Sequence, residues 1–393
     1  MAASPRLLAA AYAGVMGAIG AFGPYFGLVM DRLGYTAAVI GGIWALMPIT
    51  RIVVTPLWAL LADRFRLGTR ILQGASFATV LAVAAMATGL LPAVGIAAAM
   101  VLFAAMRAPM GPILDALTVR SLEESGQDPS RYGRIRLWGS VAFLGTAGAG
   151  ALLAEHVGWA PAPLALATGV WLVGFFVTLL LPAGAADGPV RLGPALRTLS
   201  RRPGLPLVVV ALCLYGMGLN AYDAWYAVHV EKLGLASTWT GVALALGVSL
   251  EIGVMAMATR ILRRADPTTL VAAAMATATV RWALVAVLTD PVLLTALQLL
   301  HGVVFGIYWI GIVELFRRAA PREIRASAQA VVITASYGIG PLLTSVVASA
   351  LVDDLGTSAL FGVASASAGV AAALTLLARP RLRAAFASEP AAP

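Results

Sequence analysis

Apolar residues form long, nearly unbroken runs along the whole chain. Each run is about 20 residues long, which is the length of a helix that crosses the hydrocarbon core of a bilayer. Backbone groups inside lipid must find hydrogen-bond partners within the protein, and the runs do not alternate as barrel strands do, so we predict helices. Twelve spans are expected, at residues 7–30, 37–61, 70–91, 93–119, 137–155, 160–182, 204–230, 236–260, 268–289, 291–316, 325–351 and 357–378.

A polar motif repeats at an offset of two hundred residues. Asp31-Arg32-Leu33-Gly34 matches Glu231-Lys232-Leu233-Gly234, and each copy follows a pair of aromatic residues. The repeat predicts an all-α integral membrane protein of two parallel six-helix halves, with a solute site between them near the midplane. The expected segments are an N-terminal half at 1–182, a cytoplasmic linker at 183–203 with a short surface helix, a C-terminal half at 204–378 and a cytoplasmic tail at 379–393.

Composition and charge agree with a membrane location. Apolar residues make up 60% of the chain and charged residues only 11%, against about 25% in soluble domains. Of the 27 Lys and Arg residues, 22 fall on one side of the predicted spans and two, Arg32 and Lys232, fall on the other. The positive-inside rule then predicts a multi-pass protein of the bacterial plasma (inner) membrane with both termini in the cytoplasm. This topology explains the net charge of +9 without a nucleic-acid partner.

The sequence shows no pattern typical of a metal site, a cofactor site or an enzyme. Cys213 is the single cysteine, which excludes an intrachain disulfide and a cysteine-based metal site. No His-Glu-x-x-His and no Gly-x-Ser-x-Gly motif occurs, and no segment suggests a separate soluble domain. We therefore expect a monomer in a lipid bilayer that acts on a small solute and protons, with no cofactor and no metal.

Eight ionisable side chains fall well inside the predicted spans. They are Arg51, Arg107, Asp115, Asp223, Glu251, Arg281, His301 and Glu314. Facing lipid they would together cost on the order of 20 kcal/mol, so they must line a cavity or pair with one another. Interhelical ion pairs and positions near helix ends are the alternative roles for these residues.

The predicted span 291–316 carries a stripe of polar and aromatic residues. Gln298, His301, Phe305, Tyr308 and Ile312 recur at three- and four-residue steps, which places them on one face of a helix. Such a face suits an amphipathic organic solute. Because the histidine side chain titrates near neutral pH, His301 is a candidate for proton handling.

The predicted span 93–119 contains a weak point at membrane depth. Pro109 and Pro112 flank Gly111, and proline both removes a backbone donor and disturbs the preceding turn. Broken helices at this depth are tolerated where they line a cavity. Arg107 beside the break is a candidate anchor for a solute carboxylate, because guanidinium holds carboxylate with two parallel hydrogen bonds.

Aromatic residues gather near the end of the predicted span 204–230. Tyr222, Trp225 and Tyr226 would contact the solute, or they belong to the aromatic belt at the membrane surface. The sequence leaves both interpretations open.

The repeat also aligns two charges of opposite sign. Arg51 and Glu251 occupy equivalent positions two hundred residues apart, at the same predicted depth. Opposite charges on a shared scaffold are what a site between two halves would require. We therefore rank Glu251 first among the candidate proton carriers and include Arg51 among the residues expected to contact the solute.

One loop resembles a motif of the major facilitator superfamily. Ala59-Leu60-Leu61-Ala62-Asp63-Arg64, followed by Gly68 and Arg70, is similar to the loop between the second and third helices of that superfamily. The resemblance implies the major facilitator fold. It also implies that Asp63, Arg64 and Arg70 form a conformational latch at the cytoplasmic face and do not bind the solute.

Further segments resemble the phenylpropionate permease family, which is related to the lactose and nucleoside proton symporters. They are residues 132–143, Arg281-Trp282, Gln298-Leu299-Leu300-His301 with Phe305-Gly306, and Tyr337-Gly338-Ile339-Gly340. In the lactose permease pattern, a glutamate, an arginine and a histidine on the eighth, ninth and tenth helices bind sugar and couple protons. The resemblance implies these roles for Glu251, Arg281 and His301. Asp115, one of the ionisable groups inside the predicted spans, is the reserve candidate for the proton carrier.

The expected function is a proton-coupled symporter that imports a small organic solute by alternating access. An aromatic carboxylate such as phenylpropionate is the favoured solute. A proton-coupled exporter of drugs or metabolites and a nucleoside or sugar symporter are the alternatives. The residues expected to contact the solute are Arg107, Arg51, Gln298, Phe305, Tyr308, Tyr222, Trp225 and Tyr226.

Overall fold

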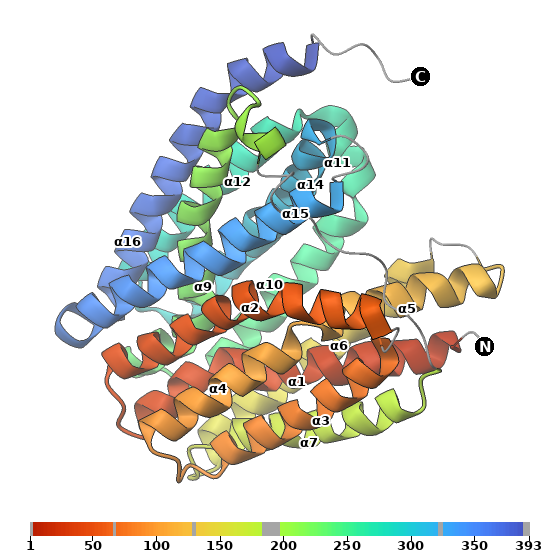
Figure 1. The fold of residues 1–393 in the computed structure, drawn as a ribbon. Coiled ribbons are helices and arrows are strands. Elements are labelled where there is room, and N and C mark those ends of the chain that lie inside the picture. Colours follow the sequence, from red (N-terminus) through yellow and green to blue (C-terminus); the bar gives the residue numbers. More distant parts are fainter. Residues whose placement is uncertain (1–2, 66–67, 128–130, 183–196, 321–324, 388–393) are drawn as a thin grey trace. The chain divides into compact units, whose positions relative to one another are not determined.

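A computed structural model describes residues 3–65, 68–127, 131–182, 197–320 and 325–387, and every regular element in these ranges is helical (Figure 1). The elements are α1 (Pro5–Arg32), α2 (Ala37–Phe65), α3 (Gly68–Ala87), α4 (Ala93–Arg107), α5 (Met110–Glu124), α6 (Arg131–His156), α7 (Ala162–Leu179), α9 (Leu205–Lys232), α10 (Thr238–Ala256), α11 (Ala258–Arg264), α12 (Pro267–Val287), α13 (Pro291–Ala296), η1 (Leu297–Leu300), η2 (Gly302–Ile307), α14 (Tyr308–Ala319), α15 (Arg325–Thr334), η4 (Ala335–Ile339) and α16 (Gly340–Ala387). The turn η1 is a 3-10 helix, whereas η2 and η4 are π-helical.

Eleven helical stretches of the described chain are long and apolar enough to cross a membrane. The last of them, Ala328–Phe386, has 59 residues. At about 1.5 Å per residue it is far longer than one crossing of a hydrocarbon core about 30 Å thick. Gly356 interrupts it with a φ of 76°, between the predicted spans 325–351 and 357–378. The all-helical, multi-pass prediction is confirmed, and the twelve predicted spans agree with these stretches once the bend is counted.

The predicted weak point near Pro109 is a break between two helices. α4 ends at Arg107, where the amide of Ala108 still donates to the carbonyl oxygen of Ala104 at 3.2 Å. α5 begins at Met110, directly after the proline. Arg107 therefore occupies the last position of a helix that ends within the membrane-spanning stretch 93–124.

Two predicted helices differ from the structure in a way that matters for the site. The span 291–316 is not one regular α-helix, because η1 and η2 tighten and then widen its turns between α13 and α14. The span 137–155 begins earlier than predicted, since α6 starts at Arg131. Arg136 lies within α6, although the sequence pattern assigned it to the preceding loop.

The chain forms two compact units. Unit 1 comprises residues 1–189 together with 224–245, and unit 2 comprises 190–223 together with 246–393. The end of α9 belongs to unit 1 because it packs against α1, where a methyl group on Gly27 would meet the backbone of Ala224. The predicted halves, divided at the linker 183–203, remain a prediction. Most of that linker lies outside the described residues, and α16 extends into the predicted tail as far as Ala387.

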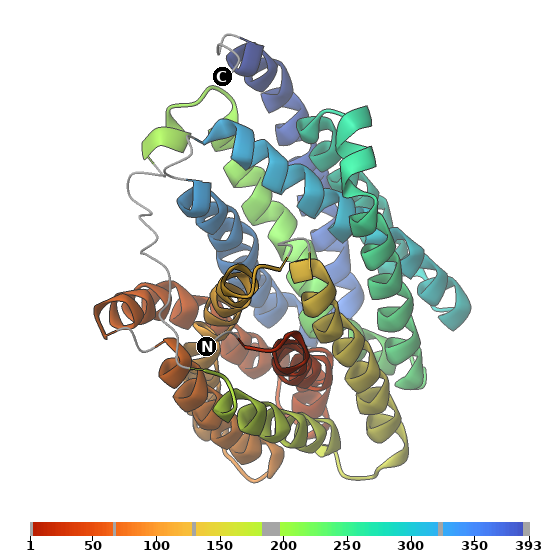
Figure 2. The same ribbon diagram turned by 90° about the vertical axis from the view of Figure 1, so that its right-hand side faces the viewer.

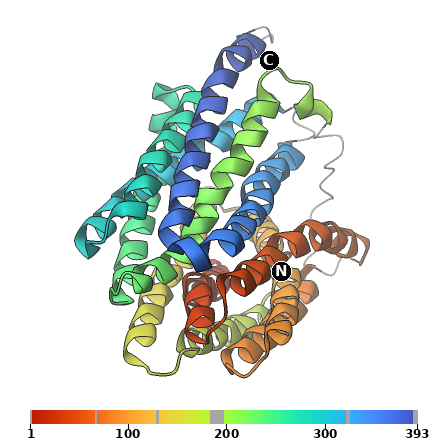
Figure 3. The same ribbon diagram turned by 90° about the vertical axis from the view of Figure 1, so that its left-hand side faces the viewer.

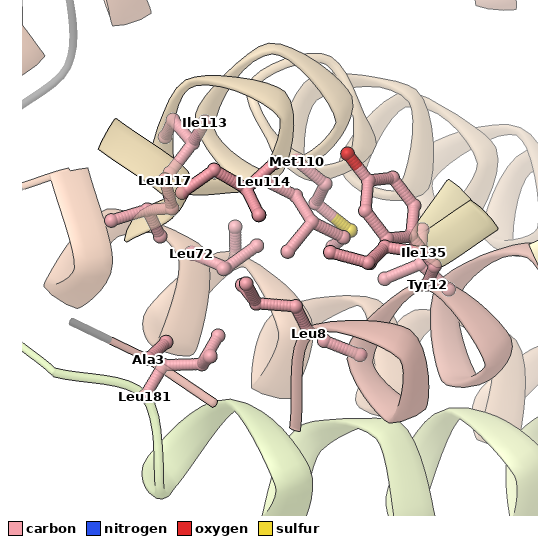
Figure 4. Packing of buried hydrophobic residues seen from close by; sticks show 14 residues of the cluster. Ala3, Leu8, Tyr12, Leu72, Met110, Ile113, Leu114, Leu117, Ile135 and Leu181 are labelled. Atoms are coloured by element: carbon pink, nitrogen blue, oxygen red, sulfur yellow. The ribbon is translucent and has the colours of Figure 1, made fainter. Parts of the chain in front are cut away.

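In unit 1, α1 packs between α6 and α7 (Figure 2). Gly14 of α1 and Gly174 of α7 lie so close that a side chain on either would meet the other's backbone. Such contacts between small residues hold membrane helices together where the hydrophobic effect is weak. Beside them lies an apolar cluster from α1, α3, α5 and α6, in which the ring of Tyr12 lies beside Met110 and Ile135 (Figure 4).

The two copies of the repeated motif contact each other in unit 1. Nε of Arg32 lies 2.7 Å from Oε1 of Glu231, and Nζ of Lys232 lies 3.0 Å from Oδ2 of Asp31. Arg32 also donates to the carbonyl oxygen of Ala154 at 2.5 Å. These contacts join the ends of α1, α6 and α9.

In unit 2, α12 and α16 run side by side (Figure 3). α9 approaches η4 and α16 at Gly216, where a side chain would collide with the backbone of Ser336. A side chain on Gly340 would in turn collide with the backbone of Gly216. The hydroxyl of Tyr215 donates to the carbonyl oxygen of Val304. These contacts fix η2, and with it the neighbouring His301, against α9.

Candidate functional site

Four polar side chains of unit 2 form a continuous chain of contacts. Arg281 of α12 donates from Nη2 to the side-chain oxygen of Gln298, and its Nη1 lies 3.3 Å from Nδ1 of His301. Nε2 of His301 lies 3.4 Å from Oε2 of Glu251 on α10. Gln298 also donates to the carbonyl oxygen of Leu294 at 3.0 Å. The structure therefore brings the predicted proton-coupling residues Glu251, Arg281 and His301 together with Gln298, which was predicted to contact the solute.

The direction of these hydrogen bonds determines the tautomer of His301. An arginine nitrogen can only donate, so Nδ1 of a neutral imidazole must accept from Arg281. The imidazole proton then sits on Nε2 and points toward the carboxylate of Glu251. A neutral His301 thus links a permanent cation to a titratable acid.

Close backbone contact between α10 and η2 places Glu251 beside His301. A methyl group on Gly247 would lie 3.1 Å from Cβ of His301, and one on Gly302 would lie 3.2 Å from the backbone of Leu250. Small residues allow this approach. The irregular turns η1 and η2 flank His301, and such turns are frequent at functional sites.

Arg281 is enclosed by aromatic rings. Its side chain is completely buried. The guanidinium carbon lies 4.6 Å from the ring centroid of Tyr222 and 4.4 Å from that of Trp282. Cation–π attraction and the bond to Gln298 therefore stabilise this charge inside the membrane protein.

Asp223 is a second carboxylate near this network. Between Ala211 and Val230 every residue of α9 is buried or half-buried except Asp223, which is exposed. Arg281 and Glu251 both interact electrostatically with it. The sequence indicated Asp223 only as one of several charges within the spans, because nothing in its local pattern connects it to Arg281.

The predicted stripe on residues 298–312 divides into two groups. The rings of His301 and Phe305 stack at 5.7 Å, and those of Phe305 and Trp309 stack at 6.3 Å. Tyr308 is buried elsewhere, where its hydroxyl lies 2.6 Å from that of Ser336. The prediction of one shared face was wrong for Tyr308, because η2 changes the rotation per residue. Trp309, which the sequence analysis did not select, continues the stack.

Three charged candidates of unit 1 lie on α2, α4 and α5. Arg51 is half-buried on α2, and Arg107 is half-buried at the end of α4. Asp115 of α5 accepts hydrogen bonds from the hydroxyls of Tyr12 at 2.5 Å and Tyr132 at 2.9 Å. The structure thus surrounds Asp115 with tyrosines, and in the described part of the chain no ion pair joins it to an arginine.

Five other candidates lie apart from both groups or cannot be placed. Trp225 and Tyr226 are buried within unit 1, although Tyr222 one turn earlier belongs to unit 2. Arg70 is exposed on α3. The side chains of the predicted latch residues Asp63 and Arg64 lie outside the described part of the structure.

Glu314 is accounted for by local ion pairs. Its carboxylate lies 2.6 Å from Nε of Arg317 and 2.7 Å from Nε of Arg318, both on the same helix. The interpretation as an ion pair near a helix end therefore applies to this residue.

Comparison with known proteins assigns most of the chain to one protein family. The sequence model of the MFS_1 like family matches residues 7–363. The chain belongs to the MFS_1 like family. This MFS_1 like protein is 27% identical over 375 residues to a maltose permease of Geobacillus stearothermophilus, with 92% of each chain covered. It is 29% identical over 197 residues to a probable 3-phenylpropionic acid transporter of Escherichia coli (strain K12), which covers 49% of this chain and 51% of that one.

Solved transporter structures share this fold over nearly the whole chain. The nucleoside transporter NupG superimposes with a TM-score of 0.80 at 17% identity, covering 96% of this chain and 98% of that chain. The POT family transporter PepTSo gives a TM-score of 0.73 at 12% identity, covering 98% and 99%. The MFS_1 like protein is therefore a multi-pass membrane transporter of the major facilitator type, as predicted.

Proposed function

We propose that the protein is a proton-coupled symporter that imports a small organic solute by alternating access, with an aromatic carboxylate such as phenylpropionate as the favoured solute. The observation that carries this proposal is the contact chain from Arg281 through His301 to Glu251. It joins a permanent cation to a titratable carboxylate within membrane-spanning helices.

Proton uptake at this network changes its charge. With Glu251 and Asp223 ionised and His301 neutral, the three charged side chains carry one positive and two negative charges. One proton on Glu251 makes the group neutral, and a second on Asp223 leaves the charge of Arg281 uncompensated. An anionic solute would then bind more tightly to the protonated protein, and by linkage the solute would favour protonation.

The proton gradient supplies enough energy to accumulate the solute inside the cell. An elementary charge moving inward gains about 2.3 kcal/mol per 100 mV. This energy corresponds to concentrating a solute by tens of fold. For a carboxylate anion the first proton cancels the solute's charge and is driven by the pH gradient alone, at about 1.4 kcal/mol per pH unit. A second proton per solute is needed for the membrane potential to contribute to import.

The aromatic stack favours an aromatic solute. His301, Phe305 and Trp309 present three nearly parallel rings along one side of η2 and α14. Offset stacking on such rings adds to the burial of apolar area. A phenyl group fits this chemistry, and the related probable 3-phenylpropionic acid transporter supports the choice.

We propose a monomer in the bacterial inner membrane with both termini in the cytoplasm. Asp63, Arg64 and Arg70 would form a latch at the cytoplasmic face, and Asp115 would be a reserve proton carrier.

A test uses the purified protein in liposomes with an imposed proton gradient. Uptake of phenylpropionate together with proton influx is expected for the wild type. Glu251→Gln mimics the protonated acid, so it should abolish gradient-driven accumulation but retain solute exchange across the membrane. Glu124→Gln is the control, because Glu124 is exposed and pairs with Arg120 at the surface. Accumulation by Glu251→Gln at the wild-type level would refute the coupling site.

A sugar symporter is the second candidate. The maltose permease is related over 92% of this chain, which makes maltose a specific alternative solute. Maltose that drives proton influx, without any response to phenylpropionate, would establish this candidate. Proton influx coupled to solute leaving the vesicle would instead indicate an exporter.

A further inference from the structure

Three half-buried arginine side chains of unit 1 are linked through Arg107, which interacts electrostatically with the other two. They come from different helices: Arg51 from α2, Arg107 from the end of α4 and Arg136 from α6. Arg51 and Arg136 are the charged residues that interact electrostatically with Arg107. All three side chains are half-buried within stretches apolar enough to cross a membrane.

Contacts with the surrounding helices orient two of these arginines. The indole nitrogen of Trp58 donates to the carbonyl oxygen of Ala105 at 2.8 Å and holds α2 against the end of α4, near Arg107. The guanidinium carbon of Arg136 lies 5.4 Å from the ring centroid of Tyr12, and its Nη2 lies 3.8 Å from the sulfur of Met16. Arg136 is therefore folded against α1.

Gly139, one turn after Arg136, leaves space for the arginine side chain to fold against α1. A methyl group on Gly139 would lie 3.0 Å from Nη1 of Arg136. Arg134 on the same helix is exposed, so the orientation of Arg136 is specific to its position.

No carboxylate of the described chain neutralises the three arginines. Within the described residues, none of them lies within 4.0 Å of an acidic oxygen. The carboxylate of Asp115 on α5 accepts from Tyr12 and Tyr132. Neighbouring cations that are partly withdrawn from water are stabilised by a bound anion.

We infer that Arg51, Arg107 and Arg136 form the binding site for the carboxylate group of the transported solute. This inference rests on the proposed function and narrows it, because it assigns the solute to the organic acid anions and excludes a neutral sugar as the main solute. A planar guanidinium fork binds a carboxylate through two parallel hydrogen bonds. Arg136 is the new member of the site, since its position in the sequence indicated a loop.

Equilibrium binding to the purified protein, without a proton gradient, tests the inference. The probes are phenylpropionate, cinnamate, benzoate and succinate as acids, with phenylpropionamide and maltose as neutral compounds. The wild type is expected to bind phenylpropionate about ten-fold or more tightly than the amide, since hydrogen bonds to charged groups are strong. Arg136→Gln should remove that preference and leave the affinity for the amide unchanged.

Two matched variants complete the test. Arg134→Gln removes an exposed arginine of the same helix and should bind every probe like the wild type. Arg136→Lys keeps the charge without the fork and should retain part of the preference for the acid, which reports on the site even if Arg136→Gln folds poorly.

Three results would overturn the inference. They are equal affinity of the wild type for acid and amide, binding of maltose without binding of any acid, and equal loss of acid and amide binding in a folded Arg136→Gln protein. Because binding is measured without a gradient, failure of the Glu251 coupling site would leave this measurement unaffected, so the two proposals fail separately.

Discussion

Arginines inside the two units are surrounded in opposite ways. In unit 2, Arg281 is completely buried, its two terminal nitrogens contact His301 and Gln298, and its guanidinium lies against two aromatic rings. In unit 1, Arg51 and Arg107 have no acidic partner in the described chain. A charge that the protein already satisfies suits a site that exchanges protons. A charge left unsatisfied suits a site that receives a ligand.

The largest expected effect concerns Arg281. Arg281→Gln removes the cation around which Gln298, His301 and Tyr222 are arranged, and breaking a buried charge network costs about 3–5 kcal/mol. We expect gradient-driven uptake to fall by more than about 100-fold. Initial uptake rates in liposomes measure this loss. Uptake within a few-fold of wild type would show that the enclosed arginine is structural.

The second largest effect is expected in the pH dependence of uptake, which should differ between variants of the two units. The pH gradient drives the protons that enter with the solute, so uptake should rise as the outer pH is lowered from about 8 to about 6 at a fixed inner pH. Glu251→Gln should show a flat profile over the same range. Variants of the arginines in unit 1 should keep the wild-type slope. The same pH dependence of uptake in the wild type and in every variant would contradict the assignment of proton coupling to unit 2.

Arg107 offers the reciprocal test in unit 1. Arg107→Gln should raise KM for phenylpropionate by about ten-fold or more, because it removes a charge-assisted hydrogen-bond donor. The maximal rate and the pH slope should change much less. Kinetics at a fixed gradient measure both parameters. A lowered maximal rate at unchanged KM would assign Arg107 to the conformational change.

A smaller effect is expected at the end of the aromatic stack. Trp309→Ala removes a ring that stacks on Phe305, and such contacts contribute about 0.5–1.5 kcal/mol beyond area burial. KM for phenylpropionate should rise by roughly two- to ten-fold, whereas KM for an aliphatic acid such as succinate should not. Equal changes for both acids would remove the stack from the solute site.

The smallest effect is expected where the repeated motifs meet. Lys232→Ala breaks a pair with Asp31 in which the lysine side chain is 57% exposed, and exposed pairs contribute about 0–1 kcal/mol. Unfolding temperature should fall only slightly. Asp31→Lys combined with Lys232→Asp should restore it. If the double variant unfolds at a lower temperature than the wild type, neighbouring groups determine which position carries the acid and which the base.

The sequence was sufficient for the scaffold because lipid imposes simple rules. Span lengths, the break at Pro109 and the position of Gly356 between two spans follow from helix length, proline chemistry and apolar composition. Glu251, Arg281, Gln298 and His301 stood out for a related reason, since polar groups inside a membrane are costly.

The parts that could not be predicted depend on register. The regular periodicity assumed for residues 298–312 placed Tyr308 with Phe305, whereas the π-helical turn puts Trp309 there. Arg136 stands one residue before the predicted start of its helix and therefore resembled one of the many arginines of the cytoplasmic loops. Helix ends are set by hydrogen bonds and tertiary packing, which hydropathy does not register.

The contact between the repeated motifs carries information about how such a protein could arise. An acidic residue followed by a basic one is self-complementary: two copies related by a two-fold axis pair acid with base in both directions, as Asp31 with Lys232 and Arg32 with Glu231 do here. Isologous surfaces in symmetric dimers work in the same manner, because one patch serves as both partners. A gene duplication followed by fusion would therefore have brought this closure with it, since a single ancestral sequence already encoded both of its sides.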